Sequence, residues 1–151
     1  NSLLYSMVMG NYIFGSRITG INDMPINDKL FILQSDIIKS AADKGPCVII
    51  GRCGDYILRE YDNVFRVFIH ANKEARIKRI LSKGLCDEKK VSDFITKRDK
   101  QRANYYNFYS NKRWDDLSNY HLTIDSSEFD IDEVAEIIIT AIGKIKPPAK
   151  K

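Results

Sequence analysis

The apolar positions of this chain fall into two patterns, which are short unbroken runs and longer stretches with a helical period. One run covers residues 47–50 and ends at a glycine, a second covers residues 64–69 with only Arg66 interrupting it, and a third covers residues 120–124. Short apolar runs of this kind are typical of strands that are buried on both faces of a parallel sheet. The pattern therefore predicts three strands.

Segments with apolar residues at helical spacing lie between and beside these runs. The start and stop residues predict four helices, which run from Pro25 to Gly45, from Asn72 to Gly84, from about Glu88 to Tyr109 and from Val134 to Ile145. The first carries four apolar residues at helical spacing, namely Leu30, Leu33, Ile37 and Ala41. Asp130 and Glu133 are placed to form a capping box for the last. Alternating strands and helices predict an α/β fold with a parallel sheet and right-handed crossovers.

The long helix has one stripe that mixes apolar, basic and aromatic residues. Its members, at spacings of three or four, are Val91, Ile95, Arg98, Arg102, Tyr105 and Tyr109. Because the stripe begins apolar and ends aromatic, we expect it to face inward. An inward guanidinium needs a carboxylate, a bound anion or an open cleft. Two guanidiniums one turn apart suit a phosphate; the alternative is that they pair with acids such as Asp99 or extend to solvent.

Two further arginines stand where an α/β sheet places its ligands. Arg52 follows the first apolar run and Gly51, and ligands of open α/β sheets bind beyond the carboxyl ends of the strands. Arg76 lies in the first turns of a helix, where a cation is unfavourable with the helix dipole and a nearby anion would compensate. We expect both to converge with the stripe arginines on one phosphate site. The alternatives are a loop arginine at 52 and a surface pair with Glu74 at 76.

Composition narrows the class of protein. A chain of 151 residues with 44% hydrophobic residues is the size of one domain, which we assign to residues 1–145, followed by a basic tail at 146–151. No stretch approaches the ~20 apolar residues that span a bilayer, so we expect no membrane partner. Three cysteines without close spacing argue against a disulfide framework and a zinc site, and favour a cytoplasmic location. We predict no metal-ligating residues.

Positive charge is concentrated in one part of the chain. The net charge is +4, and residues 73–113 hold thirteen basic residues against five acidic ones. A field of that sign attracts ligands that carry phosphate groups. The alternative is a solvated helix surface.

Several short motifs, each present once, lie along the chain. They are Gly51-Arg52 after an apolar run, Glu74-Ala75-Arg76, Lys97-Arg98-Asp99-x-x-Arg102, Ala103-Asn104-Tyr105-Tyr106, Trp114-Asp115-Asp116, and Ile124-Asp125-Ser126. Together they resemble bacterial cytidylate kinases, and more closely the cytidylate kinase-like group. The resemblance covers nearly the whole chain.

The resemblance implies a P-loop nucleoside-monophosphate-kinase fold, which is a three-layer α/β parallel sheet with a helical lid at about residues 83–113. It implies transfer of the γ-phosphoryl group of ATP, with Mg²⁺, to a nucleoside monophosphate, most simply CMP or dCMP. Arg76, Arg98 and Arg102 would close over the transferring group and exclude water. The residues implied to bind the acceptor are Arg52, Asp55, Asp99 and Tyr105. Ser126 and Ser127 would contact the ATP base, or belong to an ordinary loop.

Two departures from the family pattern matter. Cytidylate kinases carry Gly-Arg-Asp where this chain has Cys53, so either Asp55 orients the acceptor instead or the base preference differs. No GxxxxGK[ST] motif occurs in the 151 residues, and a triphosphate needs such a cradle. We expect the central strand with its P-loop to lie between the runs at 47–50 and 64–69. It would belong to roughly 50 further N-terminal residues, without which the chain is inactive.

Two other functions compete with the kinase reading. One is a non-catalytic module that binds nucleotides or phosphate. The other is a nucleic-acid-binding protein with stacking aromatic residues, namely Tyr105, Tyr106, Tyr109 and Trp114. We expect no nucleic-acid partner because the arginines are predicted on an inward stripe. The pattern predicts no particular oligomeric state.

Overall fold

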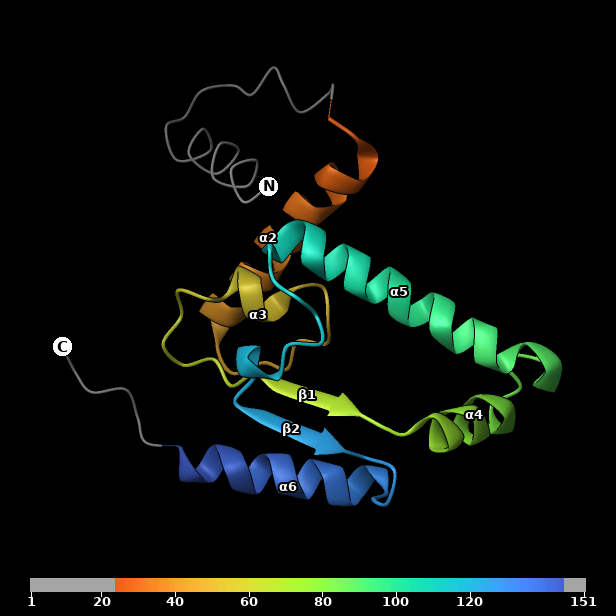
Figure 1. Ribbon diagram of the computed structural model, residues 1–151. Helices are drawn as coiled ribbons and strands as arrows, with labels where there is room; N and C mark the ends of the chain where they lie inside the picture. The colour runs from red at the N-terminus through yellow and green to blue at the C-terminus, as the bar shows by residue number, and fades with distance from the viewer. Residues whose placement is uncertain (1–23, 146–151) are drawn as a thin grey trace. The chain divides into compact units, whose positions relative to one another are not determined.

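The computed structural model of the protein describes residues 24–145 (Figure 1). The basic tail predicted at 146–151 lies outside the described residues. The chain divides into two compact units. The first unit comprises residues 1–61 and 105–112, and the second unit comprises residues 62–104 and 113–151.

The first unit is helical in its described part. Helix α2 (Ile26–Lys44) begins after Pro25 and ends at Gly45, as the sequence predicts. Its buried residues are Phe31, Ile32, Ser35 and Ile38, whereas Leu30, Leu33 and Ile37 of the apolar pattern are exposed. The buried Ser35 hydroxyl donates to the Phe31 carbonyl at 2.7 Å, so its polar group is satisfied. The apolar spacing therefore predicts the helix but not its buried side.

The strand predicted at residues 47–50 is wrong. These residues pair with no strand in the described part of the chain, and the side chains of Val48 and Ile50 are 90% and 89% exposed. A strand is held by the ladder to its neighbour, so an apolar run without a partner remains irregular. Ile49 instead packs against Gly54, where an added Cβ would lie 2.8 Å from its Cγ2 atom. The short helix α3 (Gly54–Ile57) begins at this contact.

The second unit holds the other two predicted strands. Strands β1 (Val67–His70) and β2 (Leu122–Asp125) lie side by side and are parallel, with Val67 opposite Leu122 and His70 opposite Asp125 (Figure 1). Within residues 24–145 the sheet has these two strands only. The α/β class is therefore confirmed with a smaller sheet than the three strands predicted.

Helices follow both strands, as in a parallel α/β arrangement. Helix α4 (Lys73–Ser82) begins at Asn72, whose side chain accepts a hydrogen bond from the Ala75 amide at 2.8 Å. Helix α6 (Ile131–Lys144) begins three residues earlier than predicted, with the predicted capping box between Asp130 and Glu133 in place. No helix among the described residues is long and apolar enough to cross a membrane.

Helix α5 (Val91–Ser110) belongs to both units, with residues up to 104 in the second and the last turns in the first. Val91 and Ile95 are buried, as the stripe predicts. Arg98 and Arg102 are exposed, so the inward orientation predicted for the middle of the stripe is wrong. A guanidinium loses less solvation at the surface than in an apolar interior, which explains the difference.

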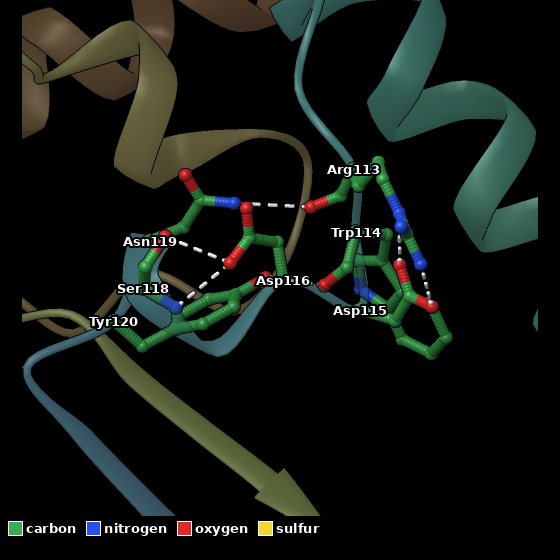
Figure 2. A network of polar contacts seen from close by, with 7 residues as sticks. All are labelled: Arg113, Trp114, Asp115, Asp116, Ser118, Asn119 and Tyr120. Atoms are coloured by element: carbon green, nitrogen blue, oxygen red, sulfur yellow. Dashed lines mark hydrogen bonds and ion pairs between the residues drawn. The ribbon is translucent and has the colours of Figure 1, made fainter.

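The loop between α5 and β2 is organised by its own polar groups (Figure 2). Asp116 accepts hydrogen bonds from the amide of Ser118 at 3.0 Å and from its hydroxyl at 2.7 Å. Asn119 donates to the carbonyl of Arg113 at 3.0 Å, and the Arg113 guanidinium pairs with Asp115 at 3.0 Å. These bonds fix a 3₁₀ turn at Leu117–Asn119 immediately before β2.

Aromatic side chains attach this loop to the sheet. The Trp114 ring meets the Phe68 ring of β1 edge-on, with 5.5 Å between centroids, and the Tyr120 ring lies 4.9 Å from the same ring. The Tyr120 hydroxyl also donates to the Trp114 carbonyl at 3.1 Å (Figure 2). The start of β2 is therefore held against β1 by ring packing as well as by the strand ladder.

Candidate active site

In the second unit, Asp99 holds two arginine side chains with one carboxylate. Arg76 of α4 donates from both terminal nitrogens to the two Asp99 oxygens, each at 2.7 Å, and Arg102 donates to Oδ1 at 3.1 Å. The hydrogen bond from Arg76 lowers the pKa of the Asp99 carboxyl, against the effect of burial, and the charges of both arginines lower it further. The carboxylate is therefore ionised at neutral pH.

Arg76 was expected to have an anion nearby, and the structure provides one. The anion that compensates its position near the start of α4 is Asp99, rather than Glu74. Asp99 was expected to bind the acceptor, but its two oxygens are already engaged by arginines. The paired alternative considered for Arg102 is likewise what the structure contains.

Arg98 differs from these two arginines. Its guanidinium lies over the ring of Phe94, one turn earlier on α5, at 5.3 Å from the ring centroid. Among the ion pairs of the described residues, none includes Arg98. Two arginines therefore share the Asp99 carboxylate, and Arg98 adds a further positive charge on the same helix. This surplus of positive charge suits an anionic ligand.

Ser126 follows β2 and is buried. Its hydroxyl donates to the His70 carbonyl at 2.9 Å and accepts from Arg79 at 3.0 Å, and Arg79 also donates to the Ser126 carbonyl. Ser127 donates to Asp125 at 2.5 Å and accepts from the Asn72 amide at 2.8 Å. Both hydroxyls thus join the ends of the strands to α4. A contact between these serines and a nucleotide base stays a prediction.

Two arginines of this unit were missed by the sequence reasoning. Arg79 stands three residues after Arg76 on α4, a spacing that places both near one face. Arg66, noted only as an interruption of an apolar run, donates from Nε to the Asn119 carbonyl at 3.0 Å and contacts His121 Nε2 at 2.7 Å. Helical spacing could have found the first, but no local signal indicates the second, because its partners lie more than 50 residues away.

In the first unit, Arg52 lies in a turn of unusual backbone conformation. Gly51, Arg52 and Cys53 have φ angles of 67°, 56° and 56°, and the Gly54 amide donates to the Gly51 carbonyl at 3.0 Å. Each residue with a side chain in the left-handed region costs roughly 1 kcal/mol. The turn projects Arg52 at an exposed position and buries Cys53.

Cys53 is neutral. Its thiol is 4% exposed, and burial followed by the negative charge of Asp55 raises its pKa to about 12, against a smaller opposite effect of Arg52. A thiolate nucleophile is therefore not available at this position. The side chain acts as a small apolar group instead.

Three tyrosines in the last turns of α5 bond to the helices of the first unit. Their hydroxyls donate to oxygens of three residues, namely Gln34 from Tyr105 at 3.2 Å, Asp55 from Tyr106 at 2.6 Å and Asp28 from Tyr109 at 2.9 Å. Burial raises the pKa of Tyr105 and Tyr109 above the ordinary tyrosine value, and the hydrogen bond to Asp28 raises that of Tyr109 further. These hydroxyls are therefore protonated donors at neutral pH.

The structure thus brings part of the predicted site together. Arg76, Asp99 and Arg102 are in direct contact, and Arg98 is on the same helix as the last two. Arg52, Asp55 and Tyr105 belong to the first unit. Convergence of the two groups on one ligand stays a prediction.

The model of the cytidylate kinase-like family matches residues 1–128. The chain belongs to the cytidylate kinase-like family. The match covers every predicted site residue, and helix α6 lies beyond it.

Two curated relatives agree with this assignment. A cytidylate kinase of Methanosarcina barkeri (strain Fusaro / DSM 804) is 31% identical over 106 residues, which are 67% of this chain and 57% of that protein. A cytidylate kinase of Methanoculleus marisnigri (strain ATCC 35101 / DSM 1498 / JR1) is 26% identical over 122 residues, 81% of this chain and 65% of that protein. The chain therefore spans less than two thirds of the length of these curated relatives.

A solved structure is also similar to this cytidylate kinase-like chain. The crystal structure of an uncharacterized protein from Eubacterium ventriosum ATCC 27560 superposes with a TM-score of 0.73 at 32% sequence identity. The likeness covers 81% of this chain and 69% of that one. The arrangement described above is thus shared with a protein of known structure.

A site for ATP with its Mg²⁺ stays a prediction for this cytidylate kinase-like chain. Within residues 24–145 there is no group of three or more His, Cys, Asp or Glu side chains that could hold a metal ion. The 151 residues contain no GxxxxGK[ST] motif to cradle a triphosphate.

Proposed function

We propose that the protein transfers a phosphoryl group to a nucleoside monophosphate, with CMP or dCMP as the acceptor. The observation that carries this proposal is the pairing of Arg76 and Arg102 on the single carboxylate of Asp99, with Arg98 on the same helix, in a chain of the cytidylate kinase-like family. Phosphoryl transfer depends on neutralising the charge of the transferring group and on aligning the reactants. Arginines supply both through their fixed set of donors.

Each residue has a role in this proposal. Arg52 binds the phosphate of the acceptor, and Asp55 with Tyr105 contacts the rest of that nucleotide. Arg98, Arg76 and Arg102 neutralise the transferring group. The bonds of Asp99 to two arginines support a role in orienting them rather than in binding the acceptor.

Part of the donor side rests on residues that the structure does not describe. ATP with Mg²⁺ is the proposed donor, in a three-layer P-loop fold, and Ser126 and Ser127 are the proposed contacts of its base. The glycine-rich loop of that fold would come from outside the described residues. A cytoplasmic location is part of the same proposal, and the three free cysteines support it.

A coupled assay tests the proposal on the full-length protein. With ATP and Mg²⁺, we expect ADP formation with CMP or dCMP, and Arg52→Ala and Arg98→Ala are each expected to lose roughly a hundredfold or more. Arg113→Ala is the matched control, because Arg113 is an exposed arginine that pairs only locally with Asp115. Unchanged turnover in both site variants would contradict the assignment.

A non-catalytic nucleotide-binding module is the second candidate. The buried, neutral Cys53 favours it, because cytidylate kinases carry a carboxylate at this position. Binding of CMP without turnover of any nucleoside monophosphate would establish this alternative in place of the kinase.

Nucleic-acid binding has less support. An inward orientation of the stripe arginines would argue against nucleic-acid binding, but Arg98 and Arg102 are exposed. The tyrosines nevertheless do not form a stacking surface, because Tyr106 is 5% exposed and the ring of Tyr109 is stacked on Phe31 at 4.0 Å. Steeply salt-dependent binding of single-stranded RNA or DNA would support nucleic-acid binding as the function.

A further inference from the structure

Tyr106 and Asp55 form a short hydrogen bond in the first unit. The Tyr106 hydroxyl donates to Asp55 Oδ2 at 2.6 Å, with the tyrosine buried and the aspartate half-buried. A hydrogen bond is strengthened where water is excluded, and its loss leaves an unsatisfied group. This bond therefore fixes the orientation of the Asp55 carboxylate.

The second oxygen of that carboxylate is available. No residue described by the structure donates a hydrogen bond to Asp55 Oδ1. Asp55 stands three residues after Arg52, in the turn that the Gly54 amide closes on the Gly51 carbonyl at 3.0 Å. The charge of Asp55 raises the pKa of the Cys53 thiol between these two residues, and the charge of Arg52 lowers it.

We propose that Tyr106 is a positioning residue, which orients Asp55 so that Oδ1 accepts a hydrogen bond from the ribose of the acceptor nucleotide. This inference rests on the proposed function, in which Arg52 binds the acceptor's phosphate. The ribose is joined directly to that phosphate, whereas the base lies beyond it. The sugar is therefore the group of the acceptor that we assign to a carboxylate three residues from the phosphate-binding arginine. Ribose hydroxyls are donors, and an ionised carboxylate is the acceptor that suits them.

Tyr109 provides a matched control on the same helix. Its hydroxyl donates to Asp28 at 2.9 Å, so it forms a second tyrosine–aspartate bond three residues later. Asp28 lies in the first turn of α2, and no role in binding is assigned to it. Tyr109→Phe keeps the ring that stacks on Phe31 and removes only the hydroxyl.

The experiment is steady-state kinetics of the full-length protein with ATP and Mg²⁺ and three acceptors, which are CMP, 2′-deoxy-CMP and 2′,3′-dideoxy-CMP. Tyr106→Phe is expected to raise the KM for CMP about five- to tenfold with little change in kcat, the effect of one lost hydrogen bond. Asp55→Asn is expected to raise it about ten- to hundredfold. In both variants the preference for CMP over the dideoxy nucleotide should shrink, and in Tyr109→Phe it should not.

Each contrary outcome overturns a defined part of the inference. Equal KM values in Tyr106→Phe and Tyr109→Phe would overturn positioning by Tyr106. An Asp55→Asn variant that weakens CMP and dideoxy-CMP equally would overturn the ribose contact. If Tyr106→Phe folds poorly, Asp55→Asn decides, because it keeps the Tyr106 ring and hydroxyl and changes only the carboxylate. An unchanged preference for CMP over the dideoxy nucleotide in Asp55→Asn would overturn the inference. No turnover by the wild type with any nucleoside monophosphate would overturn the proposed function and this inference with it.

Discussion

Arg76 and Asp99 form an ion pair with two hydrogen bonds, both at 2.7 Å. The two residues are 23 positions apart, one on α4 and one on α5, so the pair joins these helices. Paired donors match the two oxygens of a carboxylate, as they would match two oxygens of a phosphate. Asp99 therefore fixes the orientation of the Arg76 guanidinium.

Replacing Asp99 tests this relationship. Asp99→Asn removes the negative charge between two guanidiniums, so we expect the free energy of unfolding to fall by about 1–2 kcal/mol, as for a partly buried charged hydrogen bond. Phosphoryl transfer should fall as well, because the arginines lose their common support. Thermal unfolding and the coupled assay measure the two effects. Asp93→Asn is the control, since Asp93 is an exposed acid on the same helix.

The loss of folding stability at acidic pH gives a second measurement on Asp99. Its pKa is lowered in the folded chain, chiefly by the hydrogen bond from Arg76. The stabilisation is therefore complete above the ordinary aspartate pKa of about 4 and is lost as pH falls through the lower folded pKa. Asp99→Asn should lack this part of the acid transition. Parallel pH curves for the variant and the wild type would contradict the assignment.

Local signals in the sequence predict the helices well. Asn72, Gly84 and the capping box of Asp130 with Glu133 mark their ends, because each of them satisfies or terminates the backbone within a few residues. The strand prediction at residues 47–50 is wrong for the opposite reason. An apolar run becomes a strand only through a partner elsewhere in the chain, and no periodicity reports whether that partner is present.

The candidate site also contains residues that local spacing predicts and contacts that it does not. Arginines in a helical stripe can be recognised from spacing, which is why Arg98 and Arg102 were predicted as site residues. Spacing does not show whether the stripe is covered. The partner of Arg76 was not predicted because Asp99 is distant in sequence. Tyr106 was noted only as an aromatic residue, since a bond to Asp55 across 51 positions leaves no local signal.

Gly54 should tolerate no side chain. A Cβ at this position would lie 2.8 Å from Cγ2 of Ile49, inside ordinary contact distance. We expect Gly54→Ala to lower the free energy of unfolding by about 1–3 kcal/mol, as overpacking does. Gly143→Ala on α6 is the control, because nothing lies within 4 Å of its added Cβ, and it should be neutral or stabilising. Ile49→Ala should relieve part of the Gly54→Ala loss in urea denaturation, and equal losses with and without it would contradict this contact.

His121 should make the second unit less stable at mildly acidic pH. Its Nδ1 accepts the Arg66 amide at 3.1 Å, and burial followed by the charge of Arg66 lowers its pKa. The neutral ring is thus favoured in the folded chain. Its stabilising contribution is present above the ordinary histidine pKa of about 6.5 and is lost as pH falls through the lower folded pKa. We expect the melting temperature of the wild type to decrease between pH 8 and pH 5, and His121→Asn to flatten that decrease while costing stability at pH 8. The same series on His70→Asn, the other histidine, shows whether the slope belongs to position 121. A slope that His121→Asn leaves unchanged would mean that protonation of this ring does not oppose folding.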